Sequence, residues 1–243
     1  MKLDDNLQKT YDQYYENDIS EWRTLGAIDK VKNIIELAGY ENNKIIEIGA
    51  GDGSILSMLS EKKFAKEYYA VEISESAIEL LKKKKIESVI EITKFDGYKI
   101  PYPDKFFDLA ILSHVLEHVE YPRLLLRELK RISKKQLIEV PRDYSYGVDK
   151  KFKQLISYGH INVYTPTLLR FLLNTESFKI IKDKMSFYSK EIIEYSWKAN
   201  NKKSGLIFKI KLLMYLILRK LAFIIFPDSR KETMINTYTV LTE

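Results

Sequence analysis

The sequence predicts an α/β protein in which a mostly parallel β-sheet is covered by helices on both faces. Short runs of β-branched and aromatic residues alternate along the chain with segments of helical periodicity, an order typical of parallel sheets. These runs are apolar almost throughout, which indicates strands buried on both faces. The chain has 243 residues, of which 45% are hydrophobic. We therefore expect one domain over residues 1–243 with a full hydrophobic core.

The elements can be assigned in order from their periodicity and their end signals. Apolar side chains recur at three- and four-residue spacing in five predicted helices, at about residues 26–39, 54–62, 74–85, 121–133 and 166–174. Gly39 ends the first of these helices, and Ser74 is a suitable N-cap for the third. Short apolar runs predict seven strands, at about residues 44–48, 68–73, 89–92, 107–112, 136–140, 178–188 and 235–241.

Composition excludes several kinds of site. The chain has no cysteine, so disulfides and thiolate metal ligands are excluded and a reducing cytoplasm is the expected compartment. No signal peptide is expected, because the first residues lack an apolar stretch. The formal net charge of +6 is spread along the chain and favours no particular partner.

A glycine-rich turn follows the first predicted strand. Gly49, Gly51 and Gly53 lie between that strand and the next helix, where free backbone N–H groups can meet a ligand. A dinucleotide fingerprint would place its third glycine at Ser54 instead. Glu72 ends the second strand and is suited to accept hydrogen bonds from both hydroxyls of a ribose. The pattern favours a nucleoside ligand, although a tight turn can also require glycine for steric reasons alone.

Five segments carry a resemblance to a known family. They are Glu47-Ile-Gly-Ala-Gly-Asp-Gly-Ser54, the acidic Glu72, Phe95-Asp-Gly97, Ser113-His-Val-Leu-Glu-His-Val119, and the pair Ile138–Pro141 and Gly159–Pro166. Over about residues 20–188 the chain resembles the class I S-adenosylmethionine-dependent methyltransferases, in particular the group of ubiquinone-type and small-molecule methyltransferases. The resemblance implies a Rossmann-like sheet of seven strands with the last strand antiparallel.

The same resemblance implies S-adenosylmethionine as cofactor and assigns residues to it. The ribose would lie at Glu72 and Ile73, and the adenine at Asp96 and Gly97. Ser113 would border the methionine part, which the first motif contacts through Glu47, Gly49, Ala50, Gly51 and Gly53. The family departs from this chain at residues 189–234, which we expect to form a helical insertion between the last two strands.

The expected chemistry is methyl transfer to an acceptor whose proton must be removed. His160, His114 and His118 are the candidate bases, because imidazole titrates near neutral pH. His160 ranks first, whereas His118 is more readily explained as a packing residue. Asp143 and Tyr144 could reach the acceptor or serve as ordinary turn residues. No metal is expected, because the sequence has no clustered ligand set.

The N-terminal segment, residues 1–25, holds several aromatic residues that could form a lid. Tyr15, Trp22 and Arg23 are its candidate acceptor contacts, and Tyr11 and Tyr14 lie nearby. The alternative is a helix that packs these rings on the edge of the domain.

Residues 206–226 are apolar apart from Lys209, Lys211, Arg219 and Lys220, and these four cations make a membrane span costly. The segment could roof the acceptor pocket, form a homodimer, or lie on a membrane surface as a peripheral anchor.

Two functions from different classes follow. The first is methylation of a small-molecule acceptor, with O-methylation of a sugar, a phosphate-linked group or a cell-surface glycan precursor favoured over a lipid-quinone or isoprenoid. The second is a cofactor-binding partner protein without turnover. Nucleic acid is not expected, because the chain has no Asn-Pro-Pro-Tyr motif, no catalytic cysteine and no target-recognition domain.

Overall fold

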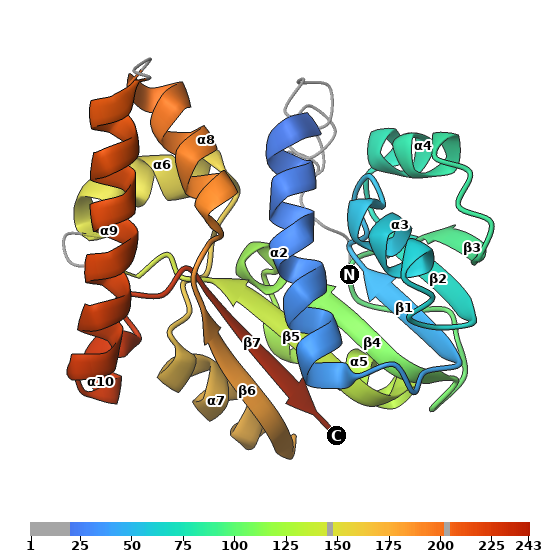
Figure 1. Cartoon of the computed structure of the whole chain (residues 1–243). Helices are drawn as coiled ribbons and strands as arrows, with labels where there is room; N and C mark the ends of the chain where they lie inside the picture. The colour runs from blue at the N-terminus through green and yellow to red at the C-terminus, as the bar shows by residue number, and fades with distance from the viewer. Residues whose placement is uncertain (1–19, 145–147, 202–204) are drawn as a thin grey trace.

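The computed structural model describes residues 20–144, 148–201 and 205–243 and contains a seven-stranded sheet (Figure 1). The strand order is β3-β2-β1-β4-β5-β7-β6. Strand β7 runs antiparallel to both of its neighbours, whereas the other pairs are parallel. The strands are β1 (Lys44–Ile48), β2 (Glu67–Glu72), β3 (Val89–Lys94), β4 (Phe107–Ser113), β5 (Ser133–Pro141), β6 (Ile180–Ser186) and β7 (Thr237–Thr242). The predicted fold class is therefore confirmed.

Helices cover both faces of this sheet. One hydrophobic cluster joins the sheet to α2 (Ser20–Ala38), α3 (Ser54–Glu61) and α4 (Glu75–Lys83). A second cluster on the opposite face joins it to α5 (Pro122–Ile132) and α7 (Pro166–Thr175). Successive strand residues enter opposite clusters, as Ile45 and Ile46 do in β1. This alternation explains why the central strands are apolar at nearly every position.

The first described helix begins earlier than its periodicity indicates. Helix α2 starts at Ser20, so Trp22 and Arg23 lie in its first turns. The Trp22 ring packs 6.3 Å from Tyr188 and 5.9 Å from Tyr195. This contact is the edge-packing alternative considered for the aromatic segment. Tyr15, with the rest of residues 1–19, lies outside the described residues.

Three helices lie between β6 and β7: α8 (Lys190–Asn201), α9 (Leu206–Ile225) and α10 (Asp228–Lys231). In Figure 1, α9 stands at the outer left of the molecule, with α8 beside it. Phe208 and Leu212 of α9 are buried against Ile193 of α8, whereas most of the other apolar side chains of α9 are exposed. Among the described residues, no helix is long and apolar enough to cross a membrane.

Three short elements were not anticipated. A 3₁₀ helix η2 (Val148–Lys151) leads into α6 (Phe152–Ser157), in a lysine-rich stretch without clear periodicity. A second 3₁₀ helix, η1 (Leu116–His118), follows β4. Together, η1 and the segment between α6 and α7 position the polar side chains described next.

Candidate active site

One pocket opens at the carboxyl ends of β1, β2 and β4, where ligands bind in open α/β sheets. The lining residues are Gly49, Glu72, Ile73, Phe95, Gly97, Tyr98, His114, Val115, His118 and Val119. The pocket thus brings together three segments that the resemblance assigns to the cofactor, and two of the three histidines.

The glycine turn is required by packing as well as by ligand approach. Gly49, Gly51 and Gly53 all have left-handed φ angles, of 70°, 55° and 73°. A Cβ atom on Gly53 would meet Leu81 Cδ1 at 1.9 Å, and one on Gly49 would meet Val115 Cγ2 at 2.6 Å. Gly53 therefore admits α4 against the turn, whereas Gly49 also lines the pocket.

The Glu72 carboxylate is fixed at the pocket wall by backbone donors. Its Oε2 accepts a hydrogen bond from Gly51 N at 2.8 Å, and its Oε1 accepts from Ile73 N at 2.7 Å and Ser74 N at 3.0 Å. The Ser74 hydroxyl in turn caps α4 by accepting from Ala77 N, as the sequence indicates. These bonds hold an acidic group where a ribose would present its hydroxyls.

The loop after β3 forms the opposite wall. Asp96 is exposed, and its Oδ1 accepts from Tyr98 N at 2.9 Å and Lys99 N at 2.7 Å. Partial burial alone would raise the pKa of Asp96. The two N–H groups outweigh this effect and hold the pKa below its usual value. Asp96 thus holds the turn that places Gly97 and Tyr98 in the wall, and it is not among the lining residues.

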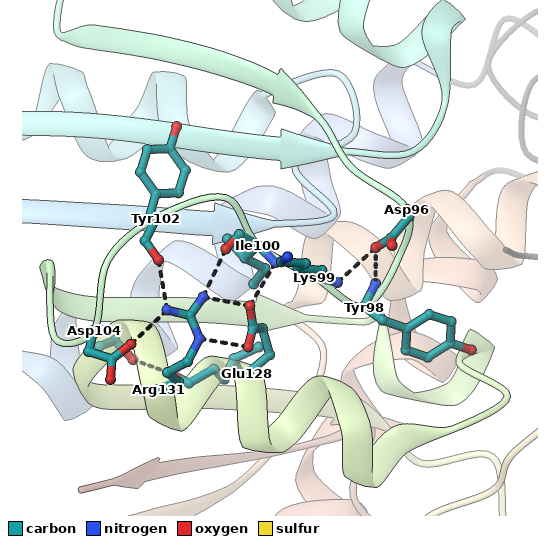
Figure 2. A network of polar contacts seen from close by, with 10 residues as sticks. Asp96, Tyr98, Lys99, Ile100, Tyr102, Asp104, Glu128 and Arg131 are labelled. Atoms are coloured by element: carbon teal, nitrogen blue, oxygen red, sulfur yellow. Dashed lines mark hydrogen bonds and ion pairs between the residues drawn. The ribbon is translucent and has the colours of Figure 1, made fainter. Parts of the chain in front are cut away.

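Figure 2 shows how the next part of this loop is tied to α5. The Arg131 guanidinium donates to the carbonyls of Ile100 and Tyr102, to Asp104 and to both oxygens of Glu128. Glu128 Oε1 also accepts from Ile100 N at 2.9 Å. The pocket wall formed by the loop after β3 therefore depends on α5.

Three other residues assigned to the cofactor lie behind the pocket surface. Ala50 is buried, and Ser113 donates its hydroxyl to Glu139 at 3.3 Å. Glu47 is buried at 2% exposure, and burial raises its pKa well above the usual value. Its Oε2 has no hydrogen-bond partner among the described residues.

The other end of the pocket carries His114 and His118. His114 has a left-handed φ of 57°, which is uncommon for a residue with a Cβ, and its Nε2 lies 3.2 Å from Glu139 Oε1. His118 Nδ1 lies 3.0 Å from the Gly159 carbonyl oxygen. Burial lowers the pKa of His114 to about 4 and that of His118 to about 3. Both rings are therefore neutral at neutral pH.

His160 reaches this end from the segment between α6 and α7. Ile161 N and Asn162 N both donate to the Glu117 carbonyl at 2.9 Å, which ties this segment to η1. The rings of His118 and His160 lie 4.7 Å apart, edge to face. His160 Nδ1 is 2.7 Å from Asp143 Oδ2. Burial alone would lower the pKa of His160, but this carboxylate raises the pKa above its ordinary value.

Two buried glutamates of this region were missed by sequence reasoning. Glu139 accepts hydrogen bonds from several side chains, whereas both carboxylate oxygens of Glu117 have no hydrogen-bond partner among the described residues. Burial raises the pKa of Glu117 to about 7. A signal was present for Glu139, because it interrupts the apolar run of a strand expected to be buried on both faces, whereas Glu117 lies in the segment after such a strand.

The remaining acceptor candidates are separated. Asp143 lies beside His160, but Tyr144 is 46% exposed. Arg23 Nε is 3.7 Å from Asp52 Oδ2 in the glycine turn. Neither Trp22 nor Arg23 lines the pocket.

Comparison with known proteins agrees with this geometry. Residues 46–136 match the family described as a methyltransferase domain. An uncharacterized methyltransferase of Schizosaccharomyces pombe is 31% identical over 104 residues, which are 39% of this chain and 37% of that protein. A fatty-acid O-methyltransferase of Mycolicibacterium smegmatis is 28% identical over 97 residues, 39% of this chain and 35% of that protein. The chain thus spans less than two thirds of the length of these curated relatives.

A solved structure extends the likeness to almost the whole chain. A complex of the Haloferax volcanii Trm112 methyltransferase activator with a methyltransferase matches at a TM-score of 0.65 and 12% identity, over 96% of both chains. At this identity the likeness concerns the fold. The matched domain at residues 46–136, the strand order and the pocket at the carboxyl ends of the strands support the resemblance to the class I S-adenosylmethionine-dependent methyltransferases.

Proposed function

We propose that the protein transfers a methyl group from S-adenosylmethionine to a hydroxyl group of a small polar acceptor. One observation carries this proposal: a single pocket joins the Gly49 and Glu72 wall to His114 and His118. Residues that suit the cofactor and two imidazole side chains thus line one cavity.

The donor set suits the cofactor. Glu72 offers a carboxylate for the two ribose hydroxyls, and the apolar side chains of Ile73, Phe95 and Tyr98 suit a planar adenine. The orphaned carboxylate of Glu47, on the strand that leads into the glycine turn, suits the ammonium group of the methionine part. When bound, S-adenosylmethionine supplies an activated methyl group on a sulfonium.

The residues around His160 are arranged to activate an acceptor oxygen. A carboxylate only accepts hydrogen bonds, so Asp143 fixes the Nδ1–H tautomer of His160 and leaves the lone pair on Nε2. This orienting role is the one an acid plays toward a catalytic histidine. Nε2 of His160 is the atom with which we expect the protein to activate the acceptor hydroxyl.

A polar acceptor is favoured by the buried charge at this end of the pocket. Glu117, Asp143 and the three histidines provide several hydrogen-bond partners there. We therefore propose a sugar, a phosphate-linked compound or a glycan precursor as acceptor.

Two measurements test this function. Calorimetric titration should detect S-adenosylmethionine and S-adenosylhomocysteine binding but no NADH binding. Formation of S-adenosylhomocysteine should then be followed with sugars, nucleotide sugars, quinols and fatty acids. We expect turnover with a polar hydroxyl compound, and we expect His160→Gln to bind the cofactor normally while losing turnover. Absence of cofactor binding would refute the proposal.

A second candidate, a lipid acceptor at a membrane surface, is favoured by α9. Ten apolar side chains of this helix are about half exposed or more: Leu206, Ile207, Ile210, Leu213, Met214, Ile217, Leu218, Leu221, Ile224 and Ile225. Lys209, Lys211 and Lys220 are exposed on the same helix and could meet anionic headgroups. A fatty-acid O-methyltransferase among the relatives is in line with such an acceptor.

Vesicle sedimentation separates this candidate from the first. If α9 binds membranes, the protein sediments with phosphatidylglycerol-containing vesicles, and the double variant Leu218→Glu with Leu221→Glu does not. Ile90→Glu is the matched control, because Ile90 is 57% exposed on β3, outside α9. Lack of sedimentation by the unmodified protein would leave the polar acceptor as the only candidate.

A further inference from the structure

Three side chains from separate parts of the chain meet beside the cofactor pocket. One ligand atom each of Glu117, His118 and His160 lies within 4.8 Å of the other two. Glu117 and His118 belong to η1, and the hydrogen bonds from Ile161 N and Asn162 N to the Glu117 carbonyl bring His160 to them. Backbone hydrogen bonds therefore bring the three side chains of the cluster together.

The two imidazoles are held in the tautomer of metal ligands. His118 Nδ1 faces the Gly159 carbonyl oxygen at 3.0 Å, and His160 Nδ1 faces Asp143 Oδ2 at 2.7 Å. Both partners are acceptors, so each Nδ1 carries the hydrogen and each neutral ring has its lone pair on Nε2. A histidine that binds a metal usually donates its other N–H to a carbonyl or a carboxylate in this way.

Glu117 gives a second, independent indication. It is 1% exposed, and both of its carboxylate oxygens lack a hydrogen-bond partner among the described residues. Its Oε1 lies 3.9 Å from His118 Nε2, which is too far for a hydrogen bond. A buried carboxyl group thus faces two nitrogen lone pairs, and its ionised form at this position requires a cation among the three ligand atoms.

We propose that Glu117, His118 and His160 bind a divalent transition-metal ion at the acceptor end of the pocket. Two imidazoles and one carboxylate are the protein ligands of many catalytic zinc sites and of non-haem iron sites, which keep open positions. Imidazole suits Zn²⁺, Co²⁺ or Fe²⁺ better than Mg²⁺ or Ca²⁺. Ligand atoms of a tetrahedral zinc site are about 3.4 Å apart, so the side chains must close by about 1 Å.

The ion would give the cluster a role in the transfer, and this part rests on the proposed function. His118 lines the cofactor pocket, so open coordination positions would face an acceptor hydroxyl. In the metal-bound protein the ion occupies the lone pair on His160 Nε2, so the Lewis acid takes over activation of the acceptor from this nitrogen and favours loss of the hydroxyl proton to water. The acceptor O–CH₃ bond then forms as the CH₃–S bond breaks, and sulfur keeps the electron pair as S-adenosylhomocysteine. The expectation from sequence that no metal is needed is revised, because the fold assembles ligands that lie far apart along the chain.

The test is metal binding measured apart from turnover. Full-length protein without a histidine tag is stripped with a chelator and titrated with Zn²⁺ by calorimetry and with Co²⁺ by visible absorption. We expect one equivalent to bind, with a Co²⁺ spectrum typical of nitrogen and oxygen ligands. Glu117→Gln and His160→Gln should each weaken binding at least 100-fold. Asp143→Asn should weaken it about 10- to 100-fold through the orientation of His160.

A matched control and a folding check complete the design. Glu120→Gln changes an exposed glutamate that lies close to Glu117 in the sequence but outside the cluster, so this variant should keep one equivalent of Zn²⁺. Thermal melting of every variant shows whether it has folded. The inference is overturned if the unmodified protein binds no Zn²⁺, or if Glu117→Gln and His160→Gln bind it unchanged. It is equally overturned if histidine NMR shows a protonated His160 paired with Glu117. Because cofactor titration is performed on the same samples, failure of metal binding alone leaves the proposed methyl transfer standing.

Discussion

Glu139 and Glu117 are two carboxylates buried to the same extent, 1% exposed, in neighbouring parts of one site. Glu139 Oε2 accepts from Thr239 Oγ1 at 2.6 Å and Asn33 Nδ2 at 2.9 Å, and its Oε1 lies near Ser113 and His114. Burial alone would raise the pKa of Glu139, but His114 and Thr239 lower this pKa to about 2. Glu117 has no such donors among the described residues.

The difference teaches that burial by itself does not mark a functional carboxylate. A buried charge with several donors can serve the fold, because the donors replace the lost hydration. A buried charge without them costs stability, so the fold gains nothing from it unless a ligand supplies the missing partner. Glu139 is therefore the structural member of the pair, and Glu117 is the one we propose to bind a ligand.

The largest expected effect is on the free energy of unfolding, and it follows from removing the hydrogen-bonded carboxylate of Glu139. Glu139→Ala leaves Asn33, Thr239 and His114 without their shared acceptor in a buried site. We expect the free energy of unfolding to fall by about 3–5 kcal/mol, measured by urea unfolding followed by circular dichroism. Glu139→Gln, which keeps one acceptor oxygen, should lose less. A fall below about 1 kcal/mol in the alanine variant would contradict the structural role.

The next effect concerns a carboxylate of a third kind, held by backbone donors yet facing the pocket. Glu72→Ala should weaken S-adenosylmethionine binding about 100-fold, or about 2.7 kcal/mol, because two ribose hydroxyls lose their acceptor. Calorimetric titration measures this change. Glu67→Ala is the matched control, since Glu67 begins the same strand and pairs with Lys44 at 3.4 Å. Unchanged affinity in Glu72→Ala would mean that the ribose lies elsewhere.

Substitution of Glu117, which has no hydrogen-bond donors among the described residues, should change the free energy of unfolding in the opposite direction. Glu117→Gln removes a buried charge that has no donors, so we expect the metal-free protein to gain about 1 kcal/mol in free energy of unfolding. Turnover should nevertheless fall about 100-fold or more. Urea unfolding and S-adenosylhomocysteine formation, measured on one preparation, give both values. If Glu117→Gln is destabilised as strongly as Glu139→Ala, both carboxylates stabilise the fold, and the proposed difference between a structural and a ligand-binding carboxylate is wrong.

The fold could be predicted from the sequence because each central strand can be recognised from its own residues. Runs such as Lys44–Ile48 and Phe107–Ser113 are apolar at nearly every position, and glycine or a helix cap follows them. Helix α2 was predicted to start too late because its first turns, around Trp22, bury one aromatic ring against distant tyrosines. Helix α6 was missed, since its six residues, Phe152–Ser157, are too few to show an apolar periodicity.

The site divides in the same way. The resemblance led to Gly49, Glu72 and Gly97 because the motif residues are close in sequence to the turns they form. The pairing of His160 with Asp143 and its approach to Glu117 depend on contacts between separate loops, which periodicity does not describe. The donors of Glu139 likewise come from α2, β4 and β7, so its satisfied state was invisible before the fold was known.

The smallest effect extends the comparison to a carboxylate at the surface of the fold. Glu128 is satisfied by Arg131, and this pair holds the loop that carries the adenine wall (Figure 2). Arg131→Met should let the loop around Ile100 and Tyr102 move, and weaken S-adenosylmethionine binding about threefold, or about 0.6 kcal/mol. Arg127→Met is the matched control, because Arg127 lies on the same helix but pairs with Glu176, away from the loop. Equal affinities of the two variants would show that the wall keeps its shape without Arg131, and that the satisfied carboxylate at this position serves the helix alone.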